Sequence, residues 1–244
     1  MSARFIWRAW KTRLRDQRFE LRAVREAMRG GGAALDIGAN KGSYLVWLAR
    51  WARGAPVVAF EPQRSLANYL QAQCMQAGLM NAKVENLALS DRAGELTLFV
   101  PGDADSPGAS LESSVADKTA CHTEQVQVTT LDAYAAQHIG QSVKVIKIDV
   151  EGHEMAVLRG AQALIQRDKP LLVIECEGRH LPEGASVAQL VALVQSWGYS
   201  ASFVWPRKGE LPFSAFNAAT HQCEVGERFW DSHDYCNNFL FRPV

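Results

Sequence analysis

The stretch that decides the fold is Asp36-Ile37-Gly38-Ala39-Asn40-Lys41-Gly42. It follows a short apolar run, 33–35, and leads into 43–50, whose apolar residues have helical spacing. A strand, a glycine turn and a helix in this order are typical of a ligand-binding turn. Gly38 lets the backbone pass close to a ligand, Gly42 lets the start of the helix pack tightly, and the helix N-terminus offers free N–H groups.

The spacing within this turn favours a cationic ligand. A dinucleotide-binding turn reads G-x-G-x-x-G, whereas this one reads D-x-G-x-x-x-G, with Asp36 before the first glycine. A carboxylate at the end of the strand would repel a pyrophosphate and attract a positive charge. S-adenosylmethionine carries an ammonium and a sulfonium group and no phosphate, so we expect it to bind here.

Composition narrows the class of protein. The 244 residues are enough for one large domain with a substantial core. Basic and acidic residues number 26 each, which gives no reason to expect a nucleic-acid partner. The five cysteines are scattered and never form a C-x-x-C pair, which argues against a disulfide framework and a structural zinc site. With neither a long apolar run nor a signal-like N-terminus, we expect a cytoplasmic protein.

Positive charge is concentrated at the N-terminus. Residues 1–30 carry nine basic residues against three acidic ones, a net charge of +6. Positions 4–29 lack proline and glycine, and their apolar residues recur at helical spacing. We therefore expect a basic N-terminal helical extension over 1–30, followed by the main domain over 31–244. The simplest interpretation of the N-terminal extension is a helix that docks through one face and leaves the other solvated. The alternative is that this helix contacts an anionic membrane surface or an acidic partner.

Strand and helix signals alternate from residue 33 onward, which indicates an α/β fold with a mostly parallel sheet and right-handed crossovers. The ligand is then expected at the carboxyl ends of the strands, near the switch in strand order. An antiparallel hairpin of the last two strands should close the sheet. The expected strands are 33–37, 56–61, 82–86, 143–149, 170–175, 199–205 and 235–241, and the expected helices are about 41–53, 65–77, 131–138, 154–167 and 187–197.

The alternation is interrupted in the middle of the chain. Positions 96–100 and 125–129 read as strands, and the polar stretch 101–124 lies between them. A loop of this length in a compact domain is usually functional or disordered. We expect it to be a lid over the acceptor, the alternative being a mobile surface loop without a role.

Two polar residues end the second and third expected strands. Glu61 lies 23 residues beyond Gly38, where an acid in a nucleotide-binding fold holds the ribose hydroxyls. Asn86 is placed to hydrogen-bond adenine. The competing interpretations are a charged strand terminus and an ordinary turn asparagine.

A second polar cluster follows the strand 143–149. Strand alternation puts Lys147, Asp149 and Glu151 on one side, so two carboxylates emerge together. They could orient an ammonium or a substrate hydroxyl. They could instead hold a divalent cation together with Glu175, although no spacing demands a metal and none is expected. His153 is a candidate base for a hydroxyl or amine proton, the alternative being a histidine at the solvent-facing start of a helix.

Taken together, these motifs resemble the FkbM-type S-adenosylmethionine-dependent methyltransferases. The resemblance implies a single Rossmann-like class I methyltransferase domain. Its sheet is mostly parallel and seven-stranded, with an antiparallel final strand and an inserted β-hairpin region. It further implies O-methylation of a hydroxyl on a sugar or another natural-product small molecule. The matching segments are 35–42, 60–62, 88–91 with Gly94, 130–132, 147–154 and 238–241.

The expected residue roles follow from the motifs and the resemblance. The catalytic candidates are Asp149, Glu151 and His153. The cofactor-binding candidates are Asp36, Gly38, Asn40, Gly42, Glu61, Asn86 and Asp149.

Two other functions are compatible with parts of this sequence. A nicotinamide-dependent oxidoreductase would share the strand, turn and acid, but it should have the third glycine of G-x-G-x-x-G, which 40–44 does not supply. A non-catalytic interaction protein could keep the same fold, yet the set of Asp36, Glu61 and Asp149 argues against a decayed site. Neither the oligomeric state nor the individual acceptor is predicted.

Overall fold

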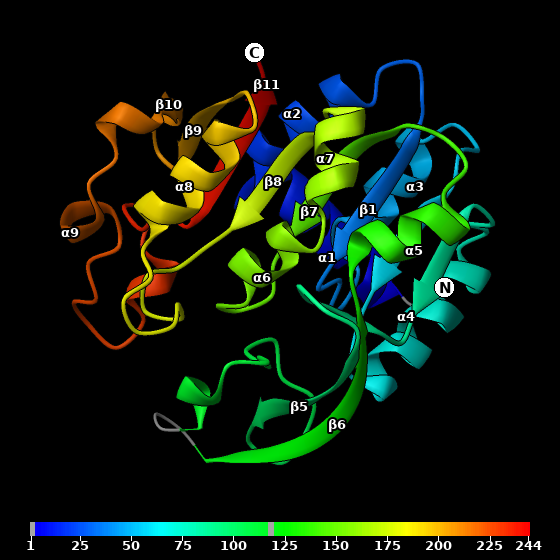
Figure 1. Ribbon diagram of the computed structural model, residues 1–244, viewed down its shortest axis with the longest axis horizontal. Helices are drawn as coiled ribbons and strands as arrows, with labels where there is room; N and C mark the ends of the chain where they lie inside the picture. The colour runs from blue at the N-terminus through cyan, green and yellow to red at the C-terminus, as the bar shows by residue number, and fades with distance from the viewer. Residues whose placement is uncertain (1–2, 117–119) are drawn as a thin grey trace.

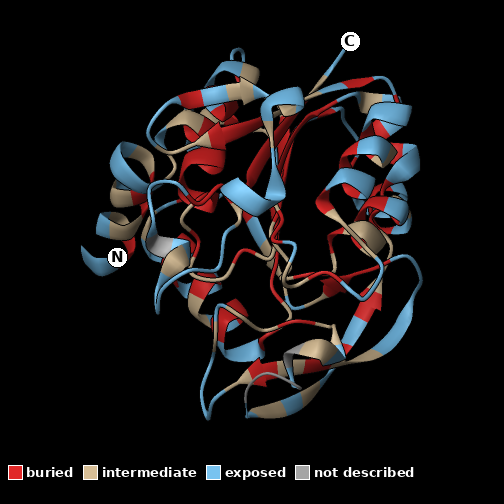
Figure 2. Ribbon diagram, turned by 90° about the vertical axis from the view of Figure 1, so that its left-hand side faces the viewer, coloured by how far each residue is buried: buried red, intermediate tan, exposed pale blue. Residues whose placement is uncertain are grey.

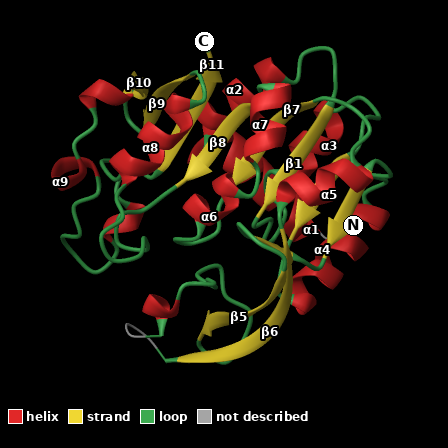
Figure 3. Cartoon of the chain, in the orientation of Figure 1, coloured by secondary structure: helices red, strands yellow, loops and turns green. Residues whose placement is uncertain are grey.

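A computed structural model of the protein describes residues 3–116 and 120–244. An eight-stranded sheet in the order β10-β9-β11-β8-β7-β1-β2-β3 runs through the molecule, with helices on both faces (Figures 1 and 3). The pairs among the five strands from β8 to β3 are all parallel, so the predicted α/β class is confirmed. The strands are β1 (Ala33–Ile37), β2 (Val57–Phe60), β3 (Ala82–Glu85), β7 (Val143–Ile148), β8 (Leu171–Glu175), β9 (Tyr199–Trp205), β10 (Gly209–Pro212) and β11 (Asn238–Pro243).

The far edge of the sheet differs from the prediction. We expected seven strands and a final hairpin of 199–205 with 235–241. Instead β9 forms its hairpin with the additional strand β10, and β11 lies between β8 and β9, antiparallel to both. β10 is short and ends in Pro212, which lacks a backbone N–H and is tolerated on an edge strand. Four residues with a terminal proline carry too little strand signal to be recognised.

Two apolar clusters bury the two faces of the sheet. One includes side chains of α5 to α8, and the other includes side chains of α1 to α4. Buried residues accordingly follow the central strands and the inner faces of the helices (Figure 2). The helices of the main domain are α3 (Leu45–Trp51), α4 (Arg64–Gln76), α5 (Leu131–His138), α6 (Glu154–Arg159), α7 (Gln162–Asp168), α8 (Val187–Ser196) and α9 (Ala218–His221).

The single helix expected over 154–167 is wrong, because a break at Gly160 separates α6 from α7. A Cβ at Gly160 would lie 2.0 Å from the carbonyl oxygen of Ser90, so only glycine fits here. The carbonyl of Gly160 accepts the backbone N–H of Asp132 over 2.8 Å. These contacts with Ser90 and Asp132 interrupt the helix at Gly160.

The N-terminal region is also divided. α1 (Ala3–Lys11), a π-helical turn (Thr12–Asp16) and α2 (Arg18–Ala27) replace the one helix expected, with a break at Gln17, whose φ is −132°. Phe5, Leu21 and Val24 are buried in the cluster shared with α3 and α4. The predicted docking face therefore exists, although Leu14, which we placed with the apolar residues of this helix, is 66% exposed.

The insertion forms a small second sheet. β5 (Gly94–Pro101) and β6 (Cys121–Thr129) pair antiparallel, and β4 (Ala88–Leu89) adds to β6. Both long strands extend further than predicted. Figure 1 shows this sheet below the carboxyl ends of β1, β7 and β8, where the site was expected. Its connection contains the 3₁₀ turn Ser113–Val115; positions 117–119 of the predicted lid lie outside the described residues.

Candidate active site

The turn after β1 is pressed against the end of β7. Gly38 has a φ of +77°, and a Cβ there would lie 1.8 Å from the carbonyl oxygen of Asp149. Gly42 leaves room for Leu70 of α4 and Phe5 of α1. Asn40 lies between them with a φ of +45°, a conformation that asparagine tolerates better than most residues. The turn therefore brings backbone from β1 and β7 together at the switch in strand order.

Glu61 holds its carboxylate at the edge of this turn. Its Oε2 accepts the backbone N–H of Asn40 over 2.8 Å, and its Oε1 accepts that of Gln63 over 2.9 Å. Burial raises the pKa of Glu61 to about 7 in spite of these hydrogen bonds. Each carboxylate oxygen has two lone pairs, so both can still accept a ribose hydroxyl.

Asp36 is a buried acid, and one of its carboxylate oxygens has no hydrogen-bond partner among the described residues. It is 2% exposed, and this oxygen is Oδ2. Burial raises its pKa to about 7; Lys147 lowers the pKa and Asp149 raises it. A buried polar atom left unpaired is costly, and an ammonium group would satisfy it. This feature fits the amino-acid part of S-adenosylmethionine.

Two adjoining cavities connect these residues. One, of about 210 Å³, is lined by Glu61 and by all three catalytic candidates, Asp149, Glu151 and His153. The other, of about 300 Å³, is lined by residues that include Asp36. Gly38, Asn40, Pro107 and Asp149 line both. The structure thus brings together most of the residues predicted from separate motifs.

Asn86 and Gly42 are not among the residues that line either cavity. The side-chain amide of Asn86 donates to the carbonyl oxygens of Glu61 at 3.0 Å and Pro62 at 2.7 Å. It thereby holds the segment that carries Glu61. Contact of Asn86 with adenine stays a prediction.

A buried lysine lies between two of the predicted carboxylates. Lys147 is 2% exposed, and its Nζ lies 3.3 Å from Oδ2 of Asp149 and 3.7 Å from Oε2 of Glu175. Burial alone would lower its pKa, but these two acids and Asp36 raise it. The ammonium is therefore an internal counter-ion for this cluster. Among the described residues, no group of three histidine, cysteine or acidic side chains is arranged to hold a metal ion.

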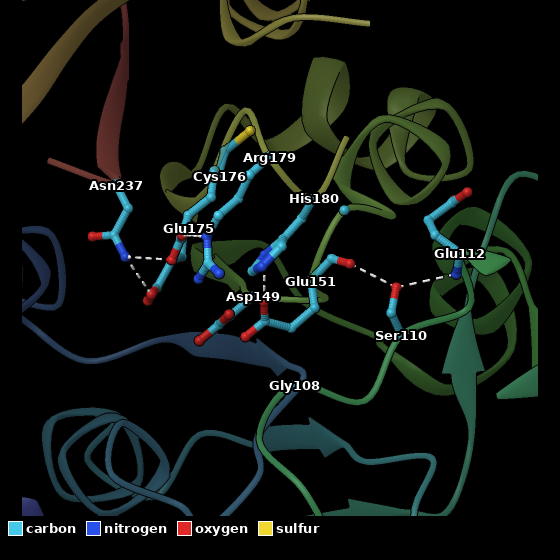
Figure 4. A network of polar contacts seen from close by, with 12 residues as sticks. Gly108, Ser110, Glu112, Asp149, Glu151, Glu175, Cys176, Arg179, His180 and Asn237 are labelled. Carbon is cyan, nitrogen blue, oxygen red and sulfur yellow. Dashed lines mark hydrogen bonds and ion pairs between the residues drawn. The ribbon is translucent and has the colours of Figure 1, made fainter. Parts of the chain in front are cut away.

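Glu151 has a partner that the sequence did not reveal. Its Oε2 lies 2.6 Å from Nδ1 of His180, on the segment after β8 (Figure 4). Glu151 has a φ of +52°, which is uncommon for a residue with a side chain and often marks a functional site. Burial raises its pKa, although the hydrogen bond from His180 lowers it.

His153 is engaged at both ring nitrogens. Its Nε2 lies 2.9 Å from Oγ of Ser90, and its Nδ1 lies 2.6 Å from Oε1 of Glu112. Glu112 belongs to the predicted lid. To act as a base, His153 would have to release one of these partners.

The predicted lid is fastened to both sides of the cavity. Ser110 donates its hydroxyl to the carbonyl oxygen of Glu151 over 2.6 Å (Figure 4). Ser106 exchanges two hydrogen bonds of 2.9 Å with the side chain of Gln63, which follows Glu61 by two residues. The lid segment also lines the cavity of about 210 Å³ through Pro107, Ala109, Ser110 and Leu111.

Sequence reasoning missed His180, Ser110 and Glu112. Ser90 lay within a quoted motif but received no role. A polar residue after a buried strand is the one signal that pointed toward His180, which follows β8 by five residues. The others belong to an irregular loop, whose path has no sequence period.

Comparisons with known proteins agree with this geometry. The model of the methyltransferase FkbM domain matches residues 36–201. The structure of methyltransferase FkbM from Methylobacillus flagellatus KT is similar, with a TM-score of 0.54, 18% identity, and coverage of 86% of this chain and 43% of that one. A putative O-methyltransferase from Klebsiella pneumoniae has a TM-score of 0.52, 12% identity, and coverage of 99% and 88%.

These structural likenesses concern the fold, and this chain spans less than half the length of the Methylobacillus protein. No curated protein matches the sequence. The family model, however, covers more than half of the chain and includes the glycine turn, Glu61 and the 147–154 cluster. The chain therefore belongs to the methyltransferase FkbM family.

Proposed function

We propose that the protein transfers the methyl group of S-adenosylmethionine to a hydroxyl of a small molecule, a sugar or another natural product. The observation that carries the proposal is the unpaired buried oxygen of Asp36. Asp36 lines one of the two adjoining cavities, Glu61 lines the other, and Asp149 lines both. Asp36 would hold the ammonium of the cofactor, and Glu61 its ribose. The bound cofactor supplies an electrophilic methyl group on a positively charged sulfur.

The residues of this chain then position the acceptor. Asp149 lies at the junction of the two cavities and is held by Lys147, so it is the first candidate to orient the acceptor hydroxyl. Glu151 lines the same cavity and is the candidate to take the hydroxyl proton. His153 remains the alternative base. Positioning supplies the larger share of the rate and the base a smaller one.

Calorimetry with S-adenosylmethionine, S-adenosylhomocysteine and NAD tests the cofactor. We expect the first two to bind and NAD not to bind. Binding of NAD alone would favour an oxidoreductase, and binding of none would favour an interaction protein. A screen of sugars and natural products with a labelled methyl donor would then identify the acceptor, with Asp149→Asn as the control for background transfer.

We also propose that the N-terminal helices contact an anionic membrane surface. Trp7 and Leu14 are 62% and 66% exposed, and Trp10 between them is 41% exposed. A spacing of three residues places Trp7 and Trp10 on one side of α1, and Leu14 lies in the π-helical turn that follows. Basic residues flank them: Arg4, Arg8, Lys11 and Arg15. Exposed aromatic residues among basic ones are typical of helices that lie on a membrane surface.

Sedimentation with vesicles tests this contact. We expect binding to vesicles that contain phosphatidylglycerol, weaker binding to pure phosphatidylcholine, and a loss of binding as salt increases. The double variant Trp7→Ser/Leu14→Ser should bind less, whereas Met75→Ser/Met80→Ser, at two exposed apolar positions elsewhere, should not change binding. Equal loss of vesicle binding in both variants would overturn the proposal.

No helix of the described residues has the length and apolar character to span a bilayer.

A further inference from the structure

We propose that His180 is a positioning residue that holds the Glu151 carboxylate toward the acceptor hydroxyl. The inference rests on the proposed methyl transfer. It assigns a role to a residue outside the 36–42 and 147–154 clusters, on the segment that follows β8.

The contact between His180 and Glu151 is built into the backbone. A Cβ at Gly152 would lie 2.2 Å from the carbonyl oxygen of His180, so glycine allows the turn after β7 to rest directly on this segment. The backbone N–H of His180 in turn donates to the carbonyl of Glu177 over 3.0 Å. The backbone of His180 is therefore held at its carbonyl and at its N–H, and Nδ1 of its imidazole lies 2.6 Å from Oε2 of Glu151.

Glu177 anchors the segment that carries His180. Its carboxylate accepts hydrogen bonds from Arg179 at 2.5 Å, from the hydroxyl of Tyr235 at 2.8 Å and from Asn237 at 3.2 Å. The same Asn237 amide donates to Glu175 at 2.7 Å, at the end of β8 (Figure 4). Such outer contacts hold a side chain in the geometry that a reaction needs.

The two histidines near Glu151 differ in how many of their ring nitrogens have a hydrogen-bond partner. His153 uses both ring nitrogens, toward Ser90 and Glu112. His180 uses Nδ1 alone; its Nε2 has no hydrogen-bond partner in the described part of the chain. His180 can thus support the charge of Glu151 without first breaking another contact.

Several charged groups act on the Glu151 carboxyl. Burial and the negative charges of Asp149 and Glu177 raise its pKa, and His180 opposes them. Glu175 and Glu154 also interact with Glu151, and Lys147 faces Asp149 and Glu175. His180 is the cationic or hydrogen-donating partner in direct contact, so its removal should disfavour the ionised form of Glu151.

The step in which the pair acts is balanced. The acceptor oxygen forms a bond to the methyl carbon, while the bond from that carbon to sulfur breaks and leaves its electron pair on sulfur. The hydroxyl proton passes to a carboxylate oxygen of Glu151 and later to solvent. The products are the methyl ether, S-adenosylhomocysteine and one proton. His180 touches neither acceptor nor cofactor in this assignment.

The test compares His180→Ala with His180→Asn in the full-length protein. Alanine removes the donor, whereas asparagine keeps an N–H donor close to the position of Nδ1. A general base contributes ~10²–10⁴-fold, so loss of its positioning should lower kcat about tenfold or more in the alanine variant, with KM little changed. Asparagine should recover most of this loss. His138→Ala, at an exposed histidine outside both cavities, is the control.

The pH dependence supplies a readout that a structural role would not move. In His180→Ala the acid limb of the kcat profile should shift to higher pH, because Glu151 loses the partner that favours its ionised form. Unchanged turnover in the alanine variant, or an asparagine variant as slow as alanine, would overturn the proposal.

An arm without acceptor separates this inference from the proposed function. Carbon-13 NMR of labelled glutamate, with the Glu151 signal assigned through Glu151→Gln, follows the carboxyl as pH varies. Its titration should move to higher pH in His180→Ala, and an unchanged titration would overturn the pairing. Failure to bind S-adenosylhomocysteine would instead remove the proposed function and leave the measured pairing intact.

Discussion

The backbone N–H of Asn40 donates a hydrogen bond to Oε2 of Glu61 over 2.8 Å, which joins the turn after β1 to the end of β2. Gln63 holds the other carboxylate oxygen. The glycine turn and the acid, which the sequence presents as two separate motifs, are therefore one unit. Glu61 is in place before a ligand arrives, so little ordering of this side chain is needed on binding.

Glu61→Ala should weaken cofactor binding. Hydrogen bonds to a charged group contribute about 1.5–3 kcal/mol, so the loss should be about tenfold or more in Kd. Calorimetry with S-adenosylhomocysteine measures it, and Arg64→Ala, on the next exposed position of the same segment, is the control. Unchanged affinity would remove Glu61 from the ribose.

Binding of S-adenosylmethionine near pH 7 should release protons. Burial raises the pKa of Asp36 and of Glu61 to about 7, so both are partly protonated in the free protein. An ammonium beside Asp36 and hydroxyl donors beside Glu61 favour the ionised forms and lower both pKa values. Calorimetry in two buffers of different ionisation enthalpy should show release at pH 7 and almost none at pH 9, where both acids are already ionised.

The variant Asp36→Asn should reduce this release at pH 7. It removes one of the two groups while keeping the size of the side chain. Equal release in the variant and the natural protein would show that Asp36 does not lose its proton on binding.

Gly38→Ala should destabilise the fold more than Gly54→Ala. Both glycines have positive φ, +77° and +90°, so each substitution costs about 1–2 kcal/mol of backbone strain. A Cβ at Gly54 meets nothing within 4 Å, whereas at Gly38 it would collide with the carbonyl of Asp149. Chemical denaturation compares the two free energies of unfolding. Equal losses would contradict the close contact.

Glu151→Gln should lower turnover more than His153→Gln. If Glu151 takes the proton, its loss should cost ~10²–10⁴-fold in kcat, and His153→Gln should cost less than about tenfold. The reason is that both nitrogens of His153 are occupied. A ~10²-fold loss in His153→Gln together with a mild effect at Glu151 would return the role of base to His153.

Deletion of 103–114 should retain cofactor binding and lose or alter acceptor turnover. The segment lines the cavity through Pro107 and Ser110 and fastens to Glu151, and closure there would exclude water. Binding of S-adenosylhomocysteine and circular dichroism control for folding. Full turnover with the same acceptor preference would show that the segment is not a lid.

Much of the fold was predictable because its signals are local. The parallel strands are short apolar runs, and α5 began and ended where its sequence indicated, with Thr130 as its N-cap. The breaks at Gln17 and Gly160 were not predictable in the same way. The break at Gly160 is caused by a contact with Ser90, which is 70 residues away in the chain. The periodicity of the local sequence carries no information about such a contact.

The candidate site likewise contains residues that could be predicted from local sequence and residues that could not. Asp36 lies just before the end of β1, Gly38, Glu61 and Asp149 follow strand ends, and parallel strands place such positions on one edge. Lys147 was placed beside Asp149 correctly, but its burial between two acids depends on tertiary packing, which includes α2 against β7 and the ring of Tyr44 beside the Lys147 ammonium. His180 joins Glu151 only because segments after β7 and β8 touch at Gly152.

The hydrogen bonds that hold the predicted lid affect the rate of the whole catalytic cycle. Four hydrogen bonds join the lid to residues that line the cavity, two to Gln63, one to Glu151 and one to His153. At about 0.5–1.5 kcal/mol each, breaking all four costs about 2–6 kcal/mol. If the segment acts as a lid, the enclosed arrangement is the resting one, and molecules enter and leave during brief, infrequent openings. The escape of the demethylated cofactor, more than the making of the ether bond, would then govern throughput, and solvent viscosity would slow it.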